Sequence, residues 1–258
     1  MQPARRVAVA GATGRLGRHL VDVLRAQGDD VVPISRSLGV DVITGEGLAE
    51  ALTGVECVID AATQPSPEED AATAFFTTSA RNLQKLGKQA GVQRILLVSI
   101  VGVDQSTGGF YAAKVAQEQA MLAGPISVRI LRATQFHEYV PEMVEWGRQD
   151  DVIYVPKMRT QLVAARSVAE ALAGMVDGSG AVPGADGAPI AEVGGPREER
   201  LVEVARLLLS RRGDTSRIEG VSNPDDPHHE LYENGGLLPG PDATLAGPTF
   251  EEWLDAQC

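Results

Sequence analysis

The stretch VAGATGRLGRHLVDVLRAQG (residues 9–28) decides the fold of this chain. It carries three glycines at three-residue spacing, Gly11, Gly14 and Gly17, directly after the apolar run Val7–Ala10. Apolar side chains then recur at the spacing of one helical face until another glycine ends the pattern. The stretch therefore predicts a strand, a tight glycine turn and an amphipathic helix, in that order.

Each glycine of the turn has its own use. Gly11 permits backbone angles that a side chain forbids, Gly14 lets a ligand approach the backbone, and Gly17 lets the helix pack closely. The first N–H groups of a helix are unpaired and carry partial positive charge, so a diphosphate fits there. A tight turn without a ligand is the alternative interpretation. The residues expected at the diphosphate are Gly11, Thr13, Gly14, Arg15, Leu16 and Gly17.

Strands and helices alternate along the first 135 residues. The later strands are predicted at Val31–Ser35, Val55–Ala61, Arg94–Ile100 and Ser127–Leu131, and helices at 48–52, 68–90 and 110–122. These strands are continuous apolar runs, which is typical of a parallel sheet covered on both faces. Pro33 is awkward for a central strand, because proline cannot donate to the ladder. We expect an α/β fold with a doubly wound parallel sheet.

The regular alternation weakens after residue 135. The elements predicted there are helices opened by capping boxes at Ser167–Glu170 and Thr249–Glu252, a strand at Ile190–Val193, a helix at Glu198–Ser210, and loops at 177–189 and 222–248. We expect residues 1–135 to form the core. Residues 136–258 are expected to form a small C-terminal lobe that contributes the substrate cleft, with elements returning to the core near 160–195.

Composition narrows the classes of partner. The 258 residues carry a net charge of −12, and such a surface repels phosphate backbones and anionic lipids. We therefore expect a small-molecule substrate, with no nucleic-acid and no membrane partner. Cys57 and Cys258 form neither a disulfide framework nor a metal-binding pattern, which favours a cytoplasmic protein without a metal. Monomer and homodimer both stay open.

The end of the second predicted strand bears on the choice of dinucleotide. Sites specific for NAD usually carry an acidic residue there, which binds the ribose hydroxyls. This strand instead runs into Ser35, Arg36 and Ser37, about 25 residues after Gly11. A guanidinium pairs with a 2′-phosphate and stacks on adenine, with Ser35, Ser37 and Arg15 assisting. This predicts NADP(H) as the cofactor, with NAD(H) as the alternative. The alternative for Arg36 itself is a solvated loop arginine that binds no ligand.

Six segments together resemble one family. They are GATGRLG (11–17), ISRS (34–37), VDVITGEGLAEALTGVECVIDAAT (40–63), LLVSIVGVD (96–104), YAAKVAQEQAM (111–121) and ILRATQFHE (130–138). On these the chain resembles, over roughly residues 5–175, the NmrA-like NAD(P)-binding proteins of the atypical short-chain dehydrogenase/reductase group. The resemblance implies a Rossmann-type sheet, a bound dinucleotide and a substrate cleft beneath the C-terminal lobe. Members include reductases of quinones and other double bonds, and regulators without turnover.

The resemblance also assigns cofactor residues beyond the glycine turn. All of them follow the carboxyl ends of strands, where open α/β sheets bind their ligands. They are Asp41 and Val42 near the adenine, Ala61, Ala62 and Thr63 along the diphosphate and ribose, and Ser99, Ile100, Ala133, Thr134 and Gln135 near the nicotinamide.

The catalytic residues match the wider group only in part. Typical short-chain dehydrogenases use Ser, Tyr and Lys, the last two spaced Tyr-x-x-x-Lys. Ser99 and Lys114 match, and the resemblance makes Lys114 a ribose-binding or proton-relaying residue. Phe110, which has no proton to give, stands at the tyrosine position. Tyr111 is the candidate acid, rotated by about 100° on the helix, and a packing tyrosine is the alternative.

His137 follows a later strand, and we expect it to contact substrate in the cleft, because histidine transfers protons near neutral pH. A satisfied, non-functional histidine is the alternative. A quinone takes its protons from water, so its reduction tolerates the loss of the tyrosine.

The sequence thus favours an NADP(H)-dependent oxidoreductase that passes hydride to a small apolar acceptor, such as a quinone or a conjugated or simple carbonyl. The rival is a non-catalytic NADP(H)-binding redox sensor. A sugar-nucleotide epimerase or dehydratase would need the full Tyr-x-x-x-Lys pattern.

Overall fold

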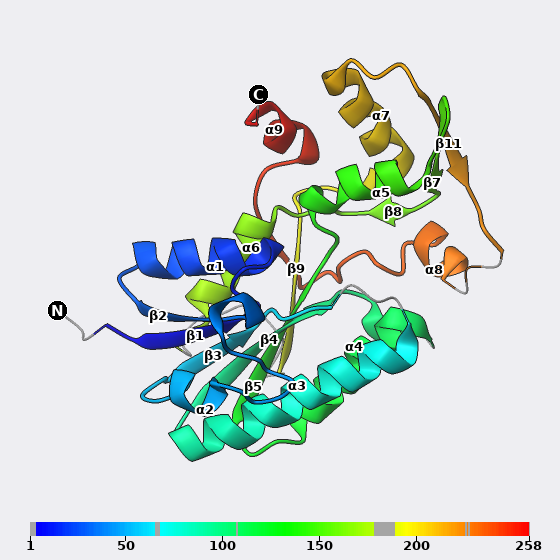
Figure 1. Cartoon of the computed structure of the whole chain (residues 1–258). Coiled ribbons are helices and arrows are strands. Elements are labelled where there is room, and N and C mark those ends of the chain that lie inside the picture. The colour runs from blue at the N-terminus through cyan, green and yellow to red at the C-terminus, as the bar shows by residue number, and fades with distance from the viewer. Residues whose placement is uncertain are drawn as a thin grey trace.

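The apolar runs of the sequence form one parallel sheet, shown in Figure 1. The computed structural model describes residues 4–64, 68–106, 108–177, 189–224, 226 and 228–257. Within these residues the sheet has seven strands in the order β12-β9-β5-β4-β3-β1-β2, all paired in parallel. The strands are β1 (Arg6–Ala10), β2 (Asp30–Ile34), β3 (Cys57–Asp60), β4 (Arg94–Ile100), β5 (Ser127–Ala133), β9 (Ile190–Gly194) and β12 (Thr244–Leu245).

Helices cover both faces of this sheet, because successive side chains of each strand point to opposite faces. Val7 and Val9 of β1 pack under one pair of helices, α1 (Arg15–Ala26) and α6 (Ala165–Gly174). Ala8 and Ala10 face the opposite layer. That layer consists of α2 (Leu48–Ala51), α3 (Glu69–Ala90) and α4 (Gly109–Leu122). The expected α/β fold with a Rossmann-type, doubly wound parallel sheet is confirmed.

The position of β2 explains how its proline is tolerated. Pro33 pairs with Val9, and β2 lies at the edge of the sheet with β1 as its neighbour. An edge strand leaves one row of N–H groups outside the ladder, so the missing N–H of proline costs no interstrand bond.

A second unit lies beyond the carboxyl ends of the central strands (Figure 1). It has its own apolar core and two small sheets, β11-β7-β6 and β10-β8. No helix in the described ranges is both long and apolar enough to cross a bilayer. The elements of the second unit are η3 (His137–Tyr139), α5 (Val140–Trp146), β6 (Arg148–Gln149), β7 (Val152–Pro156), β8 (Arg159–Thr160), β10 (Glu199–Arg200), α7 (Leu201–Arg212), β11 (Arg217–Val221), α8 (His229–Glu233) and α9 (Phe250–Asp255).

Of the two predicted capping boxes, one is confirmed and one is wrong. The Thr249 hydroxyl accepts from the Glu252 N–H at 3.2 Å while the Glu252 carboxylate accepts from the Thr249 N–H at 2.9 Å. Ser167, in contrast, lies inside α6, which begins at Ala165. The Glu138 carboxylate accepts from the Ala165 N–H at 3.1 Å, so a residue distant in sequence caps this helix.

Other boundaries after residue 135 also differ from expectation. Residues 199–200 form β10 before the helix α7 starts, and the expected loop 222–248 contains α8 and β12. The part of the expected loop at 177–189 that spans 178–188 lies outside the described residues. After residue 136 the chain returns to the central unit with α6, β9 and β12 and gives its remaining elements to the second unit.

Candidate functional site

The backbone of the glycine turn between β1 and α1 is packed too closely to leave room for side chains at Gly11 and Gly17. Gly11 has a φ of +77°, and a Cβ there would lie 2.6 Å from the carbonyl oxygen of Ala61. A Cβ at Gly17 would lie 2.0 Å from the Gly11 oxygen, so Gly17 is required by the turn itself. Gly14 is the N-cap of α1, and no side chain caps that end. The first N–H groups of α1 are therefore left for an anionic ligand, as a diphosphate site requires.

The segment after β2 carries the residues predicted for the adenosine end. Arg36 opens the short helix η1 (Arg36–Leu38) and is exposed. The hydroxyls of Ser35 and Ser37 lie 2.9 Å apart and hydrogen-bond to each other beside it. The Asp41 carboxylate accepts from the Ile43 N–H at 2.7 Å, which fixes the following turn. An exposed guanidinium flanked by two hydroxyls fits a ribose 2′-phosphate.

The carboxyl end of β3 borders the glycine turn. The Ala61 N–H donates to the Ala10 carbonyl at 3.0 Å, which holds this backbone beside the end of β1. Val42 and Ala62 are buried and Thr63 is exposed. The turn, the segment after β2 and the end of β3 thus meet at one edge of the sheet.

Lys114 is at the centre of a buried polar network below that edge. Its side chain comes from α4 and is 6% exposed. The ammonium donates to the Val98 carbonyl at 2.8 Å and to the Gln117 amide oxygen. The Gln117 amide nitrogen in turn donates to the Asp60 carboxylate at 3.1 Å, and the second Asp60 oxygen accepts from the Ala62 N–H, also at 3.1 Å.

Burial dominates the electrostatics of this network. Desolvation lowers the pKa of Lys114 from 10.5 to about 8, although the Asp60 and Glu118 carboxylates oppose the shift. Desolvation also raises the pKa of Asp60, against the Ala62 N–H, the Lys114 charge and the Gln117 amide. The ammonium further lies 4.7 Å from the centre of the Phe76 ring. The Lys114 side chain is directed inward, so the ribose contact implied by the resemblance requires one of these bonds to be exchanged.

Two buried polar atoms at the ends of β4 and β5 have no partner among the described residues. They are the Ser99 hydroxyl and the Gln135 amide nitrogen. Ser99 is 2% exposed, and the Gln135 amide oxygen accepts from the Thr160 hydroxyl at 2.8 Å. Thr134, beside Ala133 at the end of β5, donates to the Gln161 carbonyl at 2.6 Å. A buried, unpaired polar atom is costly, so these two atoms fit a site that a polar ligand completes.

Tyr111 is directed toward the second unit. Its ring lies 5.1 Å from the His228 ring in an edge-on arrangement, and it packs with the core of that unit. Its hydroxyl hydrogen-bonds to Tyr232, and burial raises its pKa well above the ordinary value. Phe110 packs edge-on against Phe76 at 5.5 Å.

His137 and Arg15 differ from what the sequence led us to expect. His137 is fully buried rather than facing a cleft, with Nε2 at 3.0 Å from the Pro248 carbonyl and its ring against Phe250. Burial lowers its pKa. Arg15 pairs with the Glu142 carboxylate and lies 5.6 Å from the centre of the Tyr139 ring, so it joins α1 to the second unit.

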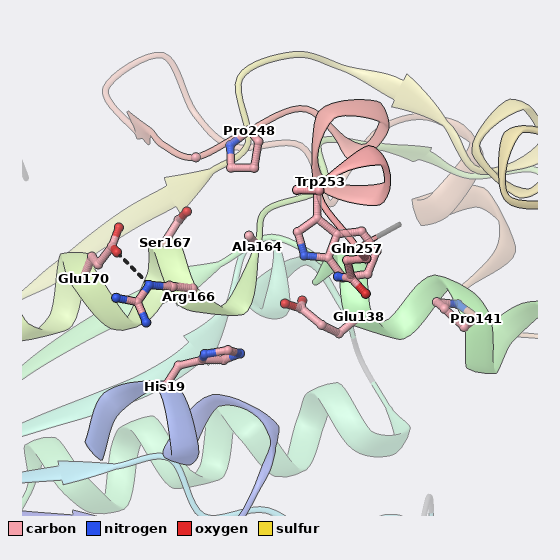
Figure 2. A pocket seen from close by; sticks show the side chains of 12 residues that line it. His19, Glu138, Pro141, Ala164, Arg166, Ser167, Glu170, Pro248, Trp253 and Gln257 are labelled. Atoms are coloured by element: carbon pink, nitrogen blue, oxygen red, sulfur yellow. Dashed lines mark hydrogen bonds and ion pairs between the residues drawn. The ribbon is translucent and has the colours of Figure 1, made fainter. Parts of the chain in front are cut away.

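A separate hollow of about 740 Å³ lies between α1, α6 and α9 (Figure 2). Figure 2 shows the His19 ring extending from α1 toward it, with Trp253 and Gln257 on the opposite side. Arg166 and Glu170, one turn apart on α6, pair at 3.2 Å on one side of it. None of the residues predicted to bind a dinucleotide lines this hollow.

The fold and the glycine turn define the class of Rossmann-type dinucleotide-binding proteins. A family model described as NAD(P)H-binding matches residues 11–177. The chain belongs to this NAD(P)H-binding family.

A curated relative, the ceramide reductase of Caulobacter vibrioides, is 33% identical in an alignment 141 residues long that covers 49% of this chain and 44% of that protein. The match thus spans less than half the length of that relative.

Two solved structures illustrate the breadth of proteins with this fold. The dTDP-4-dehydrorhamnose reductase of Bacillus anthracis in complex with NADP has a TM-score of 0.71 at 16% identity, over 98% of each chain. An NADPH-dependent quinone oxidoreductase of Escherichia coli has a TM-score of 0.65 at 20% identity, over 97% of this chain and 99% of that one. At these identities the likeness shows the fold alone.

Sequence reasoning missed the partners of Lys114. Asp60 is a carboxylate inside the apolar segment VIDAAT (58–63), and Gln117 lies three residues after Lys114 on the same helix. An isolated acid in an otherwise buried strand and a polar residue at helical spacing were the available signals.

Proposed function

We propose that this chain is an NADP(H)-dependent reductase that transfers hydride to a small apolar acceptor, such as a quinone or a conjugated or simple carbonyl. The observation that carries the proposal is the pair of unpartnered polar atoms, Ser99 Oγ and Gln135 Nε2, buried at the carboxyl edge. A bound nicotinamide and the oxygen of an acceptor would satisfy them.

The preference for NADP(H) rests on Arg36. The segment after β2 offers an exposed guanidinium and two serine hydroxyls, with no acidic side chain at the position that usually binds the ribose hydroxyls. Charge-assisted hydrogen bonds to a phosphate are stronger than neutral ones. The 2′-phosphate is therefore expected to distinguish the two dinucleotides.

The chain's own residues would hold and orient the reactants. A bound nicotinamide supplies hydride. The first N–H groups of α1 would bind the diphosphate, and the Ser99 hydroxyl would hydrogen-bond the nicotinamide amide or the acceptor oxygen. The buried side chains Val101 and Val103 make the region after β4 apolar, which favours an acceptor with few charged groups. The name of one curated relative, a ceramide reductase, supports a reductive reaction.

A redox sensor without turnover is the second candidate. The inward direction of Lys114 favours it. Phe110, at the usual tyrosine position, packs on Phe76, and Tyr111 packs on His228, so neither residue supplies the usual acid. Both candidates bind NADP(H). They differ in whether the protein consumes the reduced nucleotide when an acceptor is present.

One experiment separates the two candidates. Purified protein is mixed with NADPH and a panel of quinones and carbonyl compounds, and the absorbance of the reduced nicotinamide is followed. If the wild-type protein consumes NADPH and Gly14→Val does not, the result supports the reductase. Tight binding of NADPH with no consumption across the panel supports the sensor and contradicts the reductase.

A further inference from the structure

A serine, a histidine and an aspartate form a line beside the start of α4. Nε2 of His228 lies 2.5 Å from the hydroxyl of Ser106. Nδ1 of His228 lies 3.4 Å from Oδ1 of Asp226. The same oxygen accepts a hydrogen bond from the backbone N–H of His228 at 2.9 Å. Side chains in a row of this kind pass protons.

The surroundings of His228 fix the direction of the transfer. Nε2 also lies 3.2 Å from the Gly108 carbonyl oxygen, which can only accept a hydrogen bond. Nε2 therefore carries the proton, and the Ser106 oxygen is also placed to accept it. The Ser106 hydroxyl in turn donates to the same carbonyl at 3.2 Å. The Ser106 hydroxyl proton can therefore pass to a better acceptor. Proton transfer then runs from His228 to Ser106 and from Ser106 to the substrate.

The row lies where the carboxyl end of the sheet meets the second unit. Ser106 directly follows η2 (Val103–Gln105), in the segment that connects the end of β4, and so Ser99, to the start of α4. His228 precedes α8, which lies beside the N-terminal end of α4 (Figure 1). The ring of Tyr111, one turn before Lys114, packs edge-on against the His228 ring.

We propose that Ser106 is the proton donor of the reduction and that His228, oriented by Asp226, reloads it. This inference rests on the proposed function. During reduction of a carbonyl the hydride forms a new C–H bond and the C=O π bond breaks. The oxygen takes the Ser106 proton while Ser106 takes the Nε2 proton of the His228 imidazolium, whose other proton, on Nδ1, faces Asp226. The neutral His228 that results then recovers a proton from solvent. The row thereby supplies the acid that is missing at Phe110.

The geometry favours this role over a nucleophilic serine. A nucleophile would need N–H donors aimed at a developing oxyanion. The nearby Gly109 N–H instead donates to the Glu69 carboxylate at 2.6 Å, and a carboxylate there repels an oxyanion. A proton donor needs no such N–H groups, because it neutralises the negative charge on the substrate oxygen as that charge forms.

The kinetic test compares His228→Gln and Ser106→Ala with His229→Gln as the matched control. His229 is the neighbouring histidine, and its Nδ1 contacts the Asp226 carbonyl instead of Ser106. With a carbonyl acceptor, His228→Gln and Ser106→Ala should lower kcat by about 100-fold or more, the usual contribution of a general acid. With a quinone, which takes protons from water, kcat should change by less than about 3-fold, and NADPH affinity should stay unchanged in all three variants.

A measurement without cofactor completes the test. The chain has four histidines, so nitrogen NMR with ¹⁵N-labelled histidine resolves each imidazole, and His228→Gln assigns the signal. The relay predicts a changed Nε2 signal of His228 in Ser106→Ala. An Nε2 signal that is the same in the wild type and in Ser106→Ala overturns it. If the wild type consumes no NADPH, the proposed function fails; if it turns over and His228→Gln matches it, the relay alone fails.

Discussion

Replacing Gly17 by alanine tests the glycine turn through its backbone geometry. The added Cβ would lie 2.0 Å from the Gly11 carbonyl oxygen and 2.8 Å from the Ala12 Cα, so the turn itself must open. Overpacking costs about 1–3 kcal/mol, and contact with rigid backbone places this variant near ~3 kcal/mol. Alanine regains about 1 kcal/mol of helix propensity over glycine. The net loss of unfolding free energy is therefore about 2 kcal/mol.

The assay is thermal and urea unfolding, together with calorimetric titration of NADPH. At roughly 2–4 °C per kcal/mol, Tm of Gly17→Ala should fall by about 4–8 °C. Affinity for NADPH should fall by about tenfold or more, because losing one charge-assisted contact to a misaligned N–H costs about 1.5–3 kcal/mol.

Gly14→Ala is the matched control for Gly17→Ala. Gly14 has a φ of −76°, and a Cβ there meets only the Gly11 oxygen, at 3.1 Å. Stability should therefore change by less than about 1 kcal/mol while NADPH affinity still falls. If Gly17→Ala keeps both the wild-type Tm and the wild-type affinity, the reasoning about this turn is refuted.

Three further predictions concern separate sites. Arg36→Glu should raise the Kd for NADPH by about tenfold or more but that for NADH by less than about 3-fold in calorimetry; equal effects contradict the phosphate contact. Burial lowers the pKa of Lys114 from 10.5 to about 8, so the unfolded chain binds more protons between these values and stability should rise with pH across them. Urea unfolding of Lys114→Met should lack that rise. Thr249→Ala should lose about 1 kcal/mol in urea unfolding, whereas Thr249→Ser should not.

The first half of the fold was predictable because its signals are local. The glycine turn, the apolar run Arg94–Ile100 and the helix ending before Gly91 each depend on neighbouring residues. Even the doubtful Pro33 follows a local rule once β2 is known to be an edge strand.

The second unit was less predictable because its elements depend on distant partners. The two-residue strand β8 (Arg159–Thr160) exists through pairing with β10 (Glu199–Arg200), and α6 starts where the Glu138 carboxylate caps it. Neither partner is visible in a local pattern. A capping box at Ser167 satisfies the spacing rule, yet the tertiary contact of Glu138 determines the start of the helix.

The candidate site divides in the same way. The glycines of the turn and Arg36 follow from spacing after a strand, whereas the inward direction of Lys114 depends on Gln117 and Asp60. The row of Ser106 and His228 joins residues more than a hundred positions apart, so only the folded chain brings it together.

Calorimetric titration of the purified protein with NADPH, NADP⁺, NADH and NAD⁺ tests the central claim most directly. Backbone N–H groups at the start of α1 and the guanidinium of Arg36 should bind the 2′-phosphorylated pair more tightly than NADH and NAD⁺. Heat of binding that is largest for NADPH or NADP⁺ and lost in Gly14→Val is the predicted result. No heat and no thermal shift with any of the four nucleotides would contradict it.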